Sequence, residues 1–169
     1  MVGVQLGNGD GTFQAVQTFA TADISQSVAV GDFNGDGHPD LVVVNPDLNS
    51  VSILLGNGDG TFQSAQPYNA VTCPSFVQVA DFDGDGVQDL AVVSGCTNAL
   101  VVLLGNGDGT FQSPLTNTID DQSQSIAVTD VNSDGNPDIV IANPDLNTIS
   151  VMLGNPPETT GSVLQPVQR

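Results

Sequence analysis

Short runs of apolar and β-branched residues alternate along the chain with segments rich in Gly, Asn and Asp. Typical runs are Ser27–Val30, Leu41–Val44 and Val51–Leu55. Runs of this kind, bounded by turn residues, predict β-strands, because β-branched side chains pack well on a pleated surface. Gly or Pro interrupts every stretch that has a helical spacing of apolar residues. The pattern therefore predicts an all-β protein.

The same pattern recurs at intervals of 49 residues. The segment Leu6–Gln14 returns at 55–63 and at 104–112, and the turn Asn45–Asn49 returns at 143–147. Each repeat contains four predicted strands, of which the second and third are apolar on both faces and the fourth, at 66–69 in the first repeat, is more polar. Strands that are apolar on both faces are expected between two neighbouring sheets.

Four antiparallel strands in each repeat of about 40 to 50 residues predict β-propeller blades, which bury their faces against one another. The chain opens on a third-type strand at 2–6 and closes its regular pattern on another at 149–153, with a weak outer-strand pattern in 162–168. We divide this single repeat domain into a partial blade (1–26), three repeats (27–75, 76–124 and 125–153) and a tail (154–169).

Three blades do not close a ring, since propellers have about 4 to 8 blades. We therefore expect self-association into a homo-oligomer. In a symmetric dimer of about six blades, the N-terminal outer strand of one copy would complete the last blade of the other and leave no open sheet edge. The alternative is that the sequence is an excerpt of a longer propeller.

The charge balance narrows the range of partners and locations. The 169 residues carry 19 acidic side chains against one basic residue, which gives a formal net charge of −18. Such a surface repels phosphate groups, so we expect no nucleic acid partner and no anionic membrane surface. No apolar run reaches the ~20 residues that a membrane span needs, so no membrane insertion is expected. A signal-peptide pattern is not visible at the N-terminus.

Ten of the acidic residues lie in three nine-residue loops, 32–40, 81–89 and 130–138. Each loop has oxygen-bearing side chains at positions 1, 3, 5 and 9 and a Gly at position 6. Carboxylates this close repel one another unless a cation lies between them, and calcium binds about 6 to 8 oxygen ligands. The loops therefore predict three calcium ions per chain. The predicted ligands are side chains and the main-chain carbonyl oxygens of position 7: Asp32, Asn34, Asp36, His38 (carbonyl) and Asp40; Asp81, Asp83, Asp85, Val87 (carbonyl) and Asp89; Asp130, Asn132, Asp134, Asn136 (carbonyl) and Asp138.

Other interpretations of these loops are weaker. Simple Asx-rich turns would not require three copies in register. Magnesium prefers a tight octahedron and keeps its waters, and soft metals would need Cys or His ligands. A helix-flanked EF-hand loop would need a Glu at position 12 and a helix after the loop, whereas the segment after Asp40 has the pattern of a strand.

The two cysteines flank the second loop. Cys73 lies 12 residues before Asp85, and Cys96 lies 11 residues after it. If the segments on either side of the loop pair as an antiparallel hairpin, the two sulfur atoms meet at the end away from the loop, where a disulfide can form. The alternative is two small buried thiols. A disulfide implies an oxidising setting, extracellular or periplasmic.

The segment Val28–Val43 resembles an FG-GAP repeat of the kind found in integrin α-subunits and in bacterial surface proteins with VCBS-type repeats. The resemblance covers nearly all of residues 1–153. It implies a calcium-braced β-propeller in which the ion lies in the loop between the first two strands of each blade and is structural. The Phe-Gly and Gly-Ala-Pro sequences typical of the family are absent, which places the chain nearer the bacterial repeats and weakens any analogy with integrin ligand binding.

The primary hypothesis is a non-enzymatic, extracellular or cell-surface module for binding or adhesion, with a protein or glycan ligand. His38 is the single histidine, so we expect no catalytic Ser-His or Cys-His pair. The alternatives are a carbohydrate-binding lectin and a non-catalytic propeller of a larger secreted hydrolase or lyase. A ligand is expected at the ends of the blades away from the acidic loops, among 45–50, 94–99 and 143–148 and the connections 20–26, 69–75 and 117–125.

Five phenylalanines recur in register. We expect all of them to anchor the core: Phe13, Phe62 and Phe111 in the Gly-rich hairpins, and Phe33 and Phe82 in the acidic loops.

Overall fold

The computed structural model describes residues 1–21, 24–69, 71–119, 125–155 and 164–165. These residues form antiparallel sheets whose strands follow one another in sequence. The first sheet is a half-blade of two strands, blades 1 and 2 have four strands each, and blade 3 has three. Their strands are β1 (Val2–Val4) and β2 (Gln17–Phe19); β3 (Val28–Gly31), β4 (Asp40–Asn45), β5 (Ser50–Leu54) and β6 (Gln66–Tyr68); β7 (Pro74–Ala80), β8 (Asp89–Ser94), β9 (Ala99–Leu103) and β10 (Leu115–Thr118); and β11 (Ser125–Thr129), β12 (Asp138–Asn143) and β13 (Thr148–Met152).

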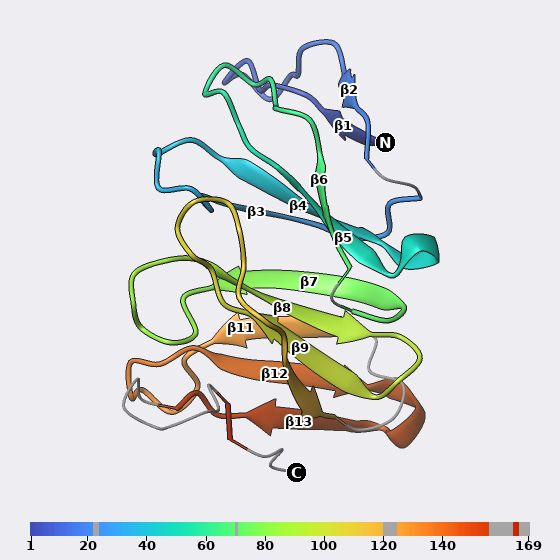
Figure 1. Cartoon of the computed structure of the whole chain (residues 1–169), viewed down its shortest axis with the longest axis vertical. Coiled ribbons are helices and arrows are strands. Elements are labelled where there is room, and N and C mark those ends of the chain that lie inside the picture. The colour runs from blue at the N-terminus through green and yellow to red at the C-terminus, as the bar shows by residue number, and fades with distance from the viewer. Residues whose placement is uncertain (22–23, 70, 120–124, 156–163, 166–169) are drawn as a thin grey trace.

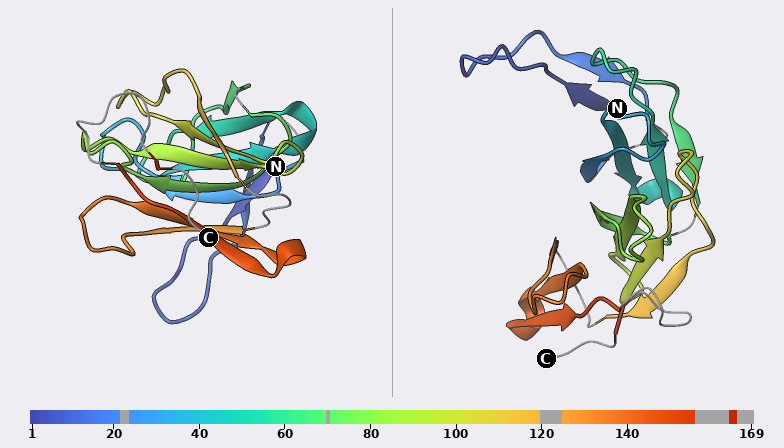
Figure 2. Two further views of the ribbon diagram at one scale, coloured as in Figure 1. Left: turned by 90° about the horizontal axis from the view of Figure 1, so that it is seen from below. Right: turned by 90° about the vertical axis from the view of Figure 1, so that its left-hand side faces the viewer.

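The sheets stack face to face as blades, so the predicted all-β fold with four-stranded antiparallel blades is confirmed (Figure 1). Seen from the side, the stack follows a curved path from the N-terminal half-blade to blade 3, like an arc of a ring (Figure 2). Closure of the ring by self-association stays a prediction.

Three apolar clusters join neighbouring sheets. Alternate residues of a strand point to opposite faces, so each central strand supplies side chains to two interfaces. Leu41 and Val43 of β4 face the half-blade, whereas Val42 and Val44 of the same strand face blade 2. Blade 2 meets blade 3 in the same way. This arrangement explains why β4, β5, β8 and β9 are buried along their whole length.

A buried aspartate at the start of each second strand ties two hairpins together. Asp89 has one carboxylate oxygen 2.7 Å from the amide nitrogen of Phe82, in the acidic loop, and the other 2.7 Å from the amide nitrogen of Gly105, in the Gly-rich hairpin. Asp40 and Asp138 make the equivalent pair of contacts. These carboxylates are at most 1% exposed, and hydrogen bonds to ionised groups are strong, so they hold the end of each blade together.

This junction leaves no room for a side chain on the hairpin glycine. A Cβ atom on Gly105 would lie 2.5 Å from the carbonyl oxygen of Gln88, and one on Gly154 would lie 2.7 Å from that of Pro137. The equivalent residue of the half-blade, Gly7, has no atom within 4 Å of the same position. The half-blade has no first and second strands among the described residues, which explains the open space.

Blade 2 carries the predicted disulfide between Cys73 and Cys96, which join the ends of β7 and β8 away from the acidic loop. The predicted turns after the second strands of blades 1 and 3 are short 3-10 helices, Pro46–Leu48 and Pro144–Leu146. Each ends on an Asn with a left-handed backbone, Asn49 and Asn147, a conformation that Asn tolerates better than most residues.

The predicted core role is confirmed for Phe33, Phe82 and Phe111, which are at most 8% exposed, and Phe62 is partly buried. It is wrong for Phe13, which is 65% exposed. Phe111 packs edge-to-face on Phe33 and Tyr68 of the preceding blade. Among the described residues, no blade precedes the sheet of Phe13 and supplies such partners.

The tail continues the repeat further than the sequence pattern suggests. Gly154 pairs with Leu164, as Gly105 pairs with Phe111, and the amide of Gln165 donates to the carbonyl of Leu153. Leu164 is buried in the cluster that contains Phe82, so it takes the place of the hairpin phenylalanine. The outer-strand prediction for 162–168 falls outside the described residues except for Leu164 and Gln165.

We predict that Gly105→Ala lowers the free energy of unfolding by about 1–3 kcal/mol, because the new methyl group meets the backbone of the acidic loop. Gly7→Ala is the matched control and should have almost no effect, since its Cβ atom meets open space. Chemical denaturation of the three proteins measures the difference. Equal stabilities for Gly105→Ala and Gly7→Ala would contradict the packing described above.

Candidate metal centre

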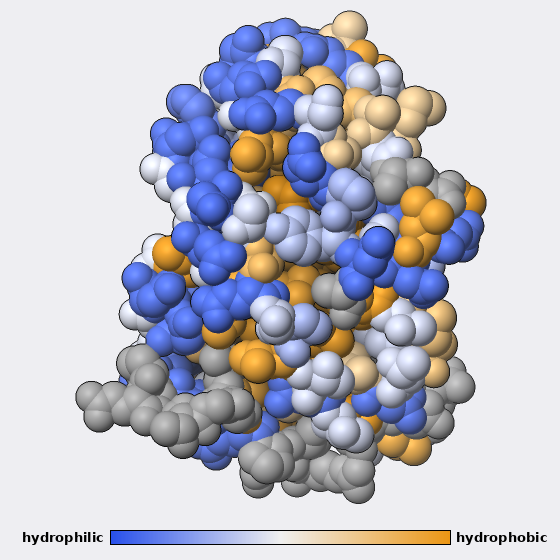
Figure 3. Space-filling model, in the orientation of Figure 1, coloured by the Kyte–Doolittle hydropathy of each residue, from blue (hydrophilic) through white to orange (hydrophobic). Residues whose placement is uncertain are grey.

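The three acidic loops lie along one edge of the stack of blades. They connect the first and second strands of blades 1, 2 and 3, namely β3 to β4, β7 to β8 and β11 to β12. In Figure 1 they project to the left, and the turns after the second strands project to the right. Hydrophilic side chains run down the same left edge in Figure 3. The blades therefore present their acidic loops in a row.

Hydrogen bonds from the loop backbone hold the carboxylates on the inner side of each loop. In the first loop, Asp32 accepts from the amides of Gly35, Asp36 and Gly37 at 2.8–3.2 Å. Asp36 in turn accepts from the amide of His38 at 2.8 Å. The glycine at position 6, Gly37, has a φ of 81°, a left-handed conformation that costs glycine little.

The second and third loops repeat these contacts. Asp81 accepts from the amides of Gly84, Asp85 and Gly86, and Asp130 accepts from those of Ser133, Asp134 and Gly135. The amides of Val87 and Asn136 donate to the carboxylate at position 5 of their own loops. All fifteen residues predicted as ligands therefore belong to three loops with one shared backbone geometry.

The loops differ in how closely their carboxylates approach. In the second loop, Asp81, Asp83 and Asp89 each offer an oxygen, and these three atoms lie within 4.8 Å of one another. Within the described parts of the chain, no other group of three or more Asp, Glu, His or Cys residues is this close. The first and third loops have Asn at position 3, and Asn34 and Asn132 each donate a side-chain hydrogen bond to the aspartate at position 5.

The pKa values of the aspartate side chains also differ between positions in the loops. Burial raises the pKa of Asp89 to about 6; hydrogen bonds from Gly105 and Phe82 lower it, and the charges of Asp83 and Asp81 add to the rise. Burial also raises the pKa of Asp83, with further contributions from Asp85 and Asp81. In the first loop, hydrogen bonds from the His38 amide and from Asn34 lower the pKa of Asp36. Burial raises the pKa of Asp40 in the first loop as well, so position 9 is an unfavourable place for an anion in both loops, most strongly at Asp89.

The donor chemistry fits a hard divalent cation. The second loop brings three carboxylate oxygens within one ion's reach, and burial, with repulsion from neighbouring carboxylates, raises the pKa values of Asp83 and Asp89. A divalent cation would remove this repulsion, and oxygen ligands are those that calcium prefers. The first and third loops offer the same kinds of ligand, with an amide oxygen in place of one carboxylate.

The first acidic loop also contacts the next blade along the chain. The amide of Asp32 donates to the side-chain oxygen of Gln88 at 2.8 Å, and the amide of Gly109 donates to the carbonyl of Phe33, also at 2.8 Å. Gln88 occupies position 8 of the second loop, where the other loops have Pro. Sequence reasoning missed this contact, because a Gln in place of Pro at position 8 does not by itself indicate a partner in another blade.

The aspartates of the Gly-rich hairpins have another role. Asp10, Asp59 and Asp108 each accept hydrogen bonds from the amide and hydroxyl of the Thr two residues later, and these bonds lower their pKa values. These side chains stabilise the hairpin turn, so the absence of Asp10, Asp59 and Asp108 from the predicted ligands agrees with their contacts.

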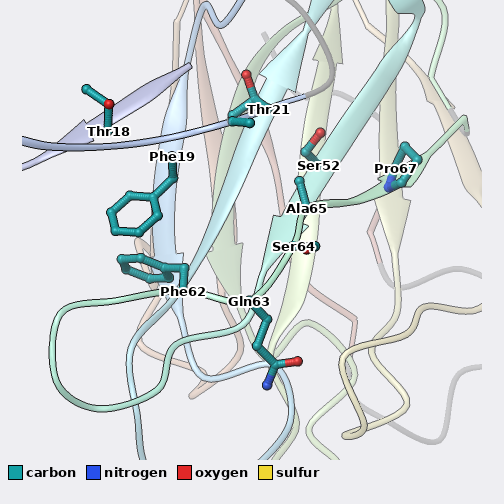
Figure 4. Close-up of a pocket in the computed structure, with 10 residues that line it drawn as sticks. Thr18, Phe19, Thr21, Ser52, Phe62, Gln63, Ser64, Ala65 and Pro67 are labelled. Atoms are coloured by element: carbon teal, nitrogen blue, oxygen red, sulfur yellow. The ribbon is translucent and has the colours of Figure 1, made fainter.

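A cavity of about 490 Å³ lies between the half-blade and blade 1. Hydroxyl and amide side chains line it, including Thr18, Ser52 and Gln63, and the rings of Phe19 and Phe62 meet edge-to-face at its wall with centroids 5.1 Å apart (Figure 4). It shares only Ala20 and Thr21 with the segments predicted to hold a ligand. Positions 22–23, 70 and 120–124 of those segments fall outside the described residues.

None of the helices in the described part of the chain has the length and apolar character that crossing a bilayer requires.

Comparison with known proteins agrees with this architecture. The sequence model of the FG-GAP-like repeat matches residues 2–43, 32–92 and 81–141, and that of the FG-GAP repeat matches 124–163. None of the curated protein sequences matches the chain.

Among solved structures, the chain is similar to a chain of a mutant Tc holotoxin pore from Photorhabdus luminescens, with a TM-score of 0.57 and 23% sequence identity. The match covers 87% of the present chain and 8% of the toxin chain, so this sequence spans a small fraction of that protein. The likeness concerns the fold alone. Because the repeat matches extend over most of the sequence, the chain belongs to the FG-GAP-like repeat family.

Proposed function

We propose that the chain is a non-enzymatic binding module in which calcium ions brace the blades of a β-propeller. The observation that carries the proposal is the second loop, where oxygens of Asp81, Asp83 and Asp89 lie within 4.8 Å of one another. FG-GAP repeats are generally calcium-binding, which supports extending the assignment to all three loops. Bound calcium would supply positive charge and additional ligand bonds at the end of each blade.

The hydrogen bonds of the buried aspartates support a structural role for the ion. The buried carboxylates of Asp40, Asp89 and Asp138 are hydrogen-bonded to the Gly-rich hairpins, so they connect each acidic loop to the third and fourth strands of its blade. The first loop is also bonded to Gln88 in the next blade. An ion that orders these loops would therefore stabilise both the blade and the contact between blades.

We further propose that the module is extracellular and contributes to binding or adhesion within a larger protein. FG-GAP repeats are typical of extracellular and surface proteins, and the disulfide between Cys73 and Cys96 suits an oxidising compartment. The similar chain in the Tc holotoxin pore is far longer than this one, which is compatible with a non-catalytic part of a larger assembly.

Carbohydrate binding is a second candidate, and the cavity between the half-blade and blade 1 favours it. Thr18, Ser52 and Gln63 offer hydroxyl and amide groups of the kind that hydrogen-bond sugar hydroxyls. We predict that a glycan array detects binding by the wild type and that Gln63→Ala weakens it, while Gln112→Ala, at the equivalent hairpin position of blade 2 and outside the cavity, does not. An array without a hit would remove this candidate and leave the calcium proposal unaffected.

We predict that calcium at a free concentration of about 100 times the Kd raises the melting temperature by about 5–10 °C for each site. The reason is that only the folded chain brings the ligands of a site together. A chelator should reverse the shift. Asp81→Asn should remove part of the increase, because Asp81 belongs to the cluster of the second loop. The control Asp47→Asn removes the same charge from a turn at the opposite edge and should retain the full increase.

Calorimetry in calcium and in chelator measures these shifts. A melting temperature that does not respond to calcium would contradict the proposed role of the ion.

Stability should also depend on pH in opposite ways with and without calcium. The pKa of Asp89 is about 6 in the fold, against an ordinary value of 3.8. Between these two pH values, the folded chain therefore keeps a proton on Asp89 that the unfolded chain has lost. Binding this proton stabilises the folded state, and the stabilisation disappears as the pH rises through about 6. In chelator, the melting temperature should rise when the pH is lowered from 7 to 5.

In calcium the trend should reverse, because protons compete with the ion for the same carboxylates. Melting curves at pH 5, 6 and 7, with calcium and with chelator, provide the comparison. If the melting temperature in chelator fell between pH 7 and pH 5, the assignment of Asp89 as a destabilised anion would be wrong.

A further inference from the structure

Blade 3 leaves exposed the face that blades 1 and 2 each bury against a following blade. In blade 1 this face contains Val42 and Val51, both fully buried. Their equivalents 98 residues later are Val140, which is partly buried, and Ile149, which is 64% exposed. We call this surface of blade 3 the open face; its residues are Ala127, Val140, Ala142, Ile149 and Val151.

The two interfaces inside the chain show what kind of surface covers such a face. Across the face of blade 1 lies β7, the first strand of blade 2, with Val77 2% exposed. Across the face of blade 2 lies β11, the first strand of blade 3, with Ile126 6% exposed. The matching partner for the open face is therefore the first strand of another blade, with apolar residues at these positions.

The first strand of blade 1 has the corresponding residues exposed. Val28 and Val30 of β3 are equivalent to Val77 and Val79 of β7, yet they are 51% and 59% exposed. Beside them lies an apolar cavity of about 350 Å³, lined in part by Val4, Val30 and Leu41. The two ends of the chain thus expose the two halves of an interface that occurs twice inside it.

The half-blade of β1 and β2 covers only part of blade 1. Val2 and Val4 pack on Leu41, Val43 and Leu54, in the positions that Ile149 and Val151 hold in β13. Directly after β1, Gln5 is exposed where the equivalent residues of the later blades are buried and apolar, as in Leu54, Leu103 and Met152. We call the half-blade the β1–β2 cap, because it covers part of the surface of blade 1.

We propose that the open face of blade 3 docks on blade 1 of a second copy of this chain, in place of that copy's β1–β2 cap. The strand β13 would take the seat of β1, and β12 would cover Val28 and Val30 of β3. If two copies make this contact reciprocally, the product is a closed ring of about six blades, within the range of known propellers. The proposal rests on the blade interfaces and does not depend on the calcium sites.

The strand positions that would form this contact carry no charge. The open face has no charged residue at its five strand positions, and Val28 and Val30 are apolar. The acidic loops project from one side of the stack, away from the faces by which neighbouring blades pack (Figure 1). Repulsion between two chains of net charge −18 should weaken association at low salt, so the test uses calcium and about 0.15 M salt.

Sedimentation velocity over a concentration series tests the proposal on the full chain. The wild type should form a reversible dimer, and Ile149→Glu should raise its dissociation constant at least about tenfold, because a charge is buried in the contact. Leu146→Glu is the matched control. Leu146 is 50% exposed on the turn of the same blade, outside the open face, so this variant should associate like the wild type.

A second variant distinguishes docking from a general loss of stability. Val4→Ser weakens the cap, since Val4 packs on blade 1, and should therefore strengthen association. Circular dichroism confirms that each variant is folded. The proposal is overturned if the wild type stays monomeric, if Leu146→Glu weakens association as much as Ile149→Glu, or if folded Val4→Ser associates less than the wild type.

Discussion

A buried carboxylate at the first position of each second strand is the interaction on which the rest of a blade depends. Asp40, Asp89 and Asp138 each accept one hydrogen bond from an acidic loop and one from a Gly-rich hairpin. A single side chain thereby fixes the turn between the first two strands and the turn between the last two. The requirement for glycine at 56, 105 and 154 follows directly, because the hairpin backbone lies against the loop backbone.

The same junction creates an electrostatic cost. Burying Asp89 beside Asp81 and Asp83 raises its pKa to about 6, so at neutral pH the fold holds an anion in an unfavourable place. Hydrogen bonds offset part of this cost and a cation would offset more. The second loop has the highest density of carboxylates and lies in the middle blade, where the disulfide also closes the opposite end. Blade 2 is thus stabilised by the Asp89 hydrogen bonds at one end and by the disulfide at the other.

The sequence was sufficient to predict the repeat, the strands of blades 1 and 2 and the disulfide, because each depends on local spacing. It did not reveal that Asp40, Asp89 and Asp138 bond to a hairpin 16 residues later, since that contact requires the paired strands. The exposure of Phe13 was missed for a related reason. Its sequence is that of a core hairpin, but burial depends on a preceding blade, which no local pattern records.

In the tail, the structure continues the repeat although the sequence pattern did not indicate it. Leu164 pairs with Gly154 as Phe111 pairs with Gly105, but the two partners are further apart in the sequence, and this obscures the 49-residue register. Leu164 fills the position of a phenylalanine because burial on Phe82 requires an apolar side chain of suitable size, and leucine satisfies that requirement. Spatial equivalence between repeats is therefore a better guide to role than sequence identity.

Counting the calcium ions that bind to each folded chain tests the central claim most directly. Equilibrium dialysis of chelator-stripped protein at pH 7, with metal analysis of the protein compartment, gives the number without reference to stability. The account predicts three ions per chain, one for each acidic loop. Absence of bound calcium at millimolar free calcium would contradict it, because the row of carboxylates would then have a role unrelated to a divalent ion.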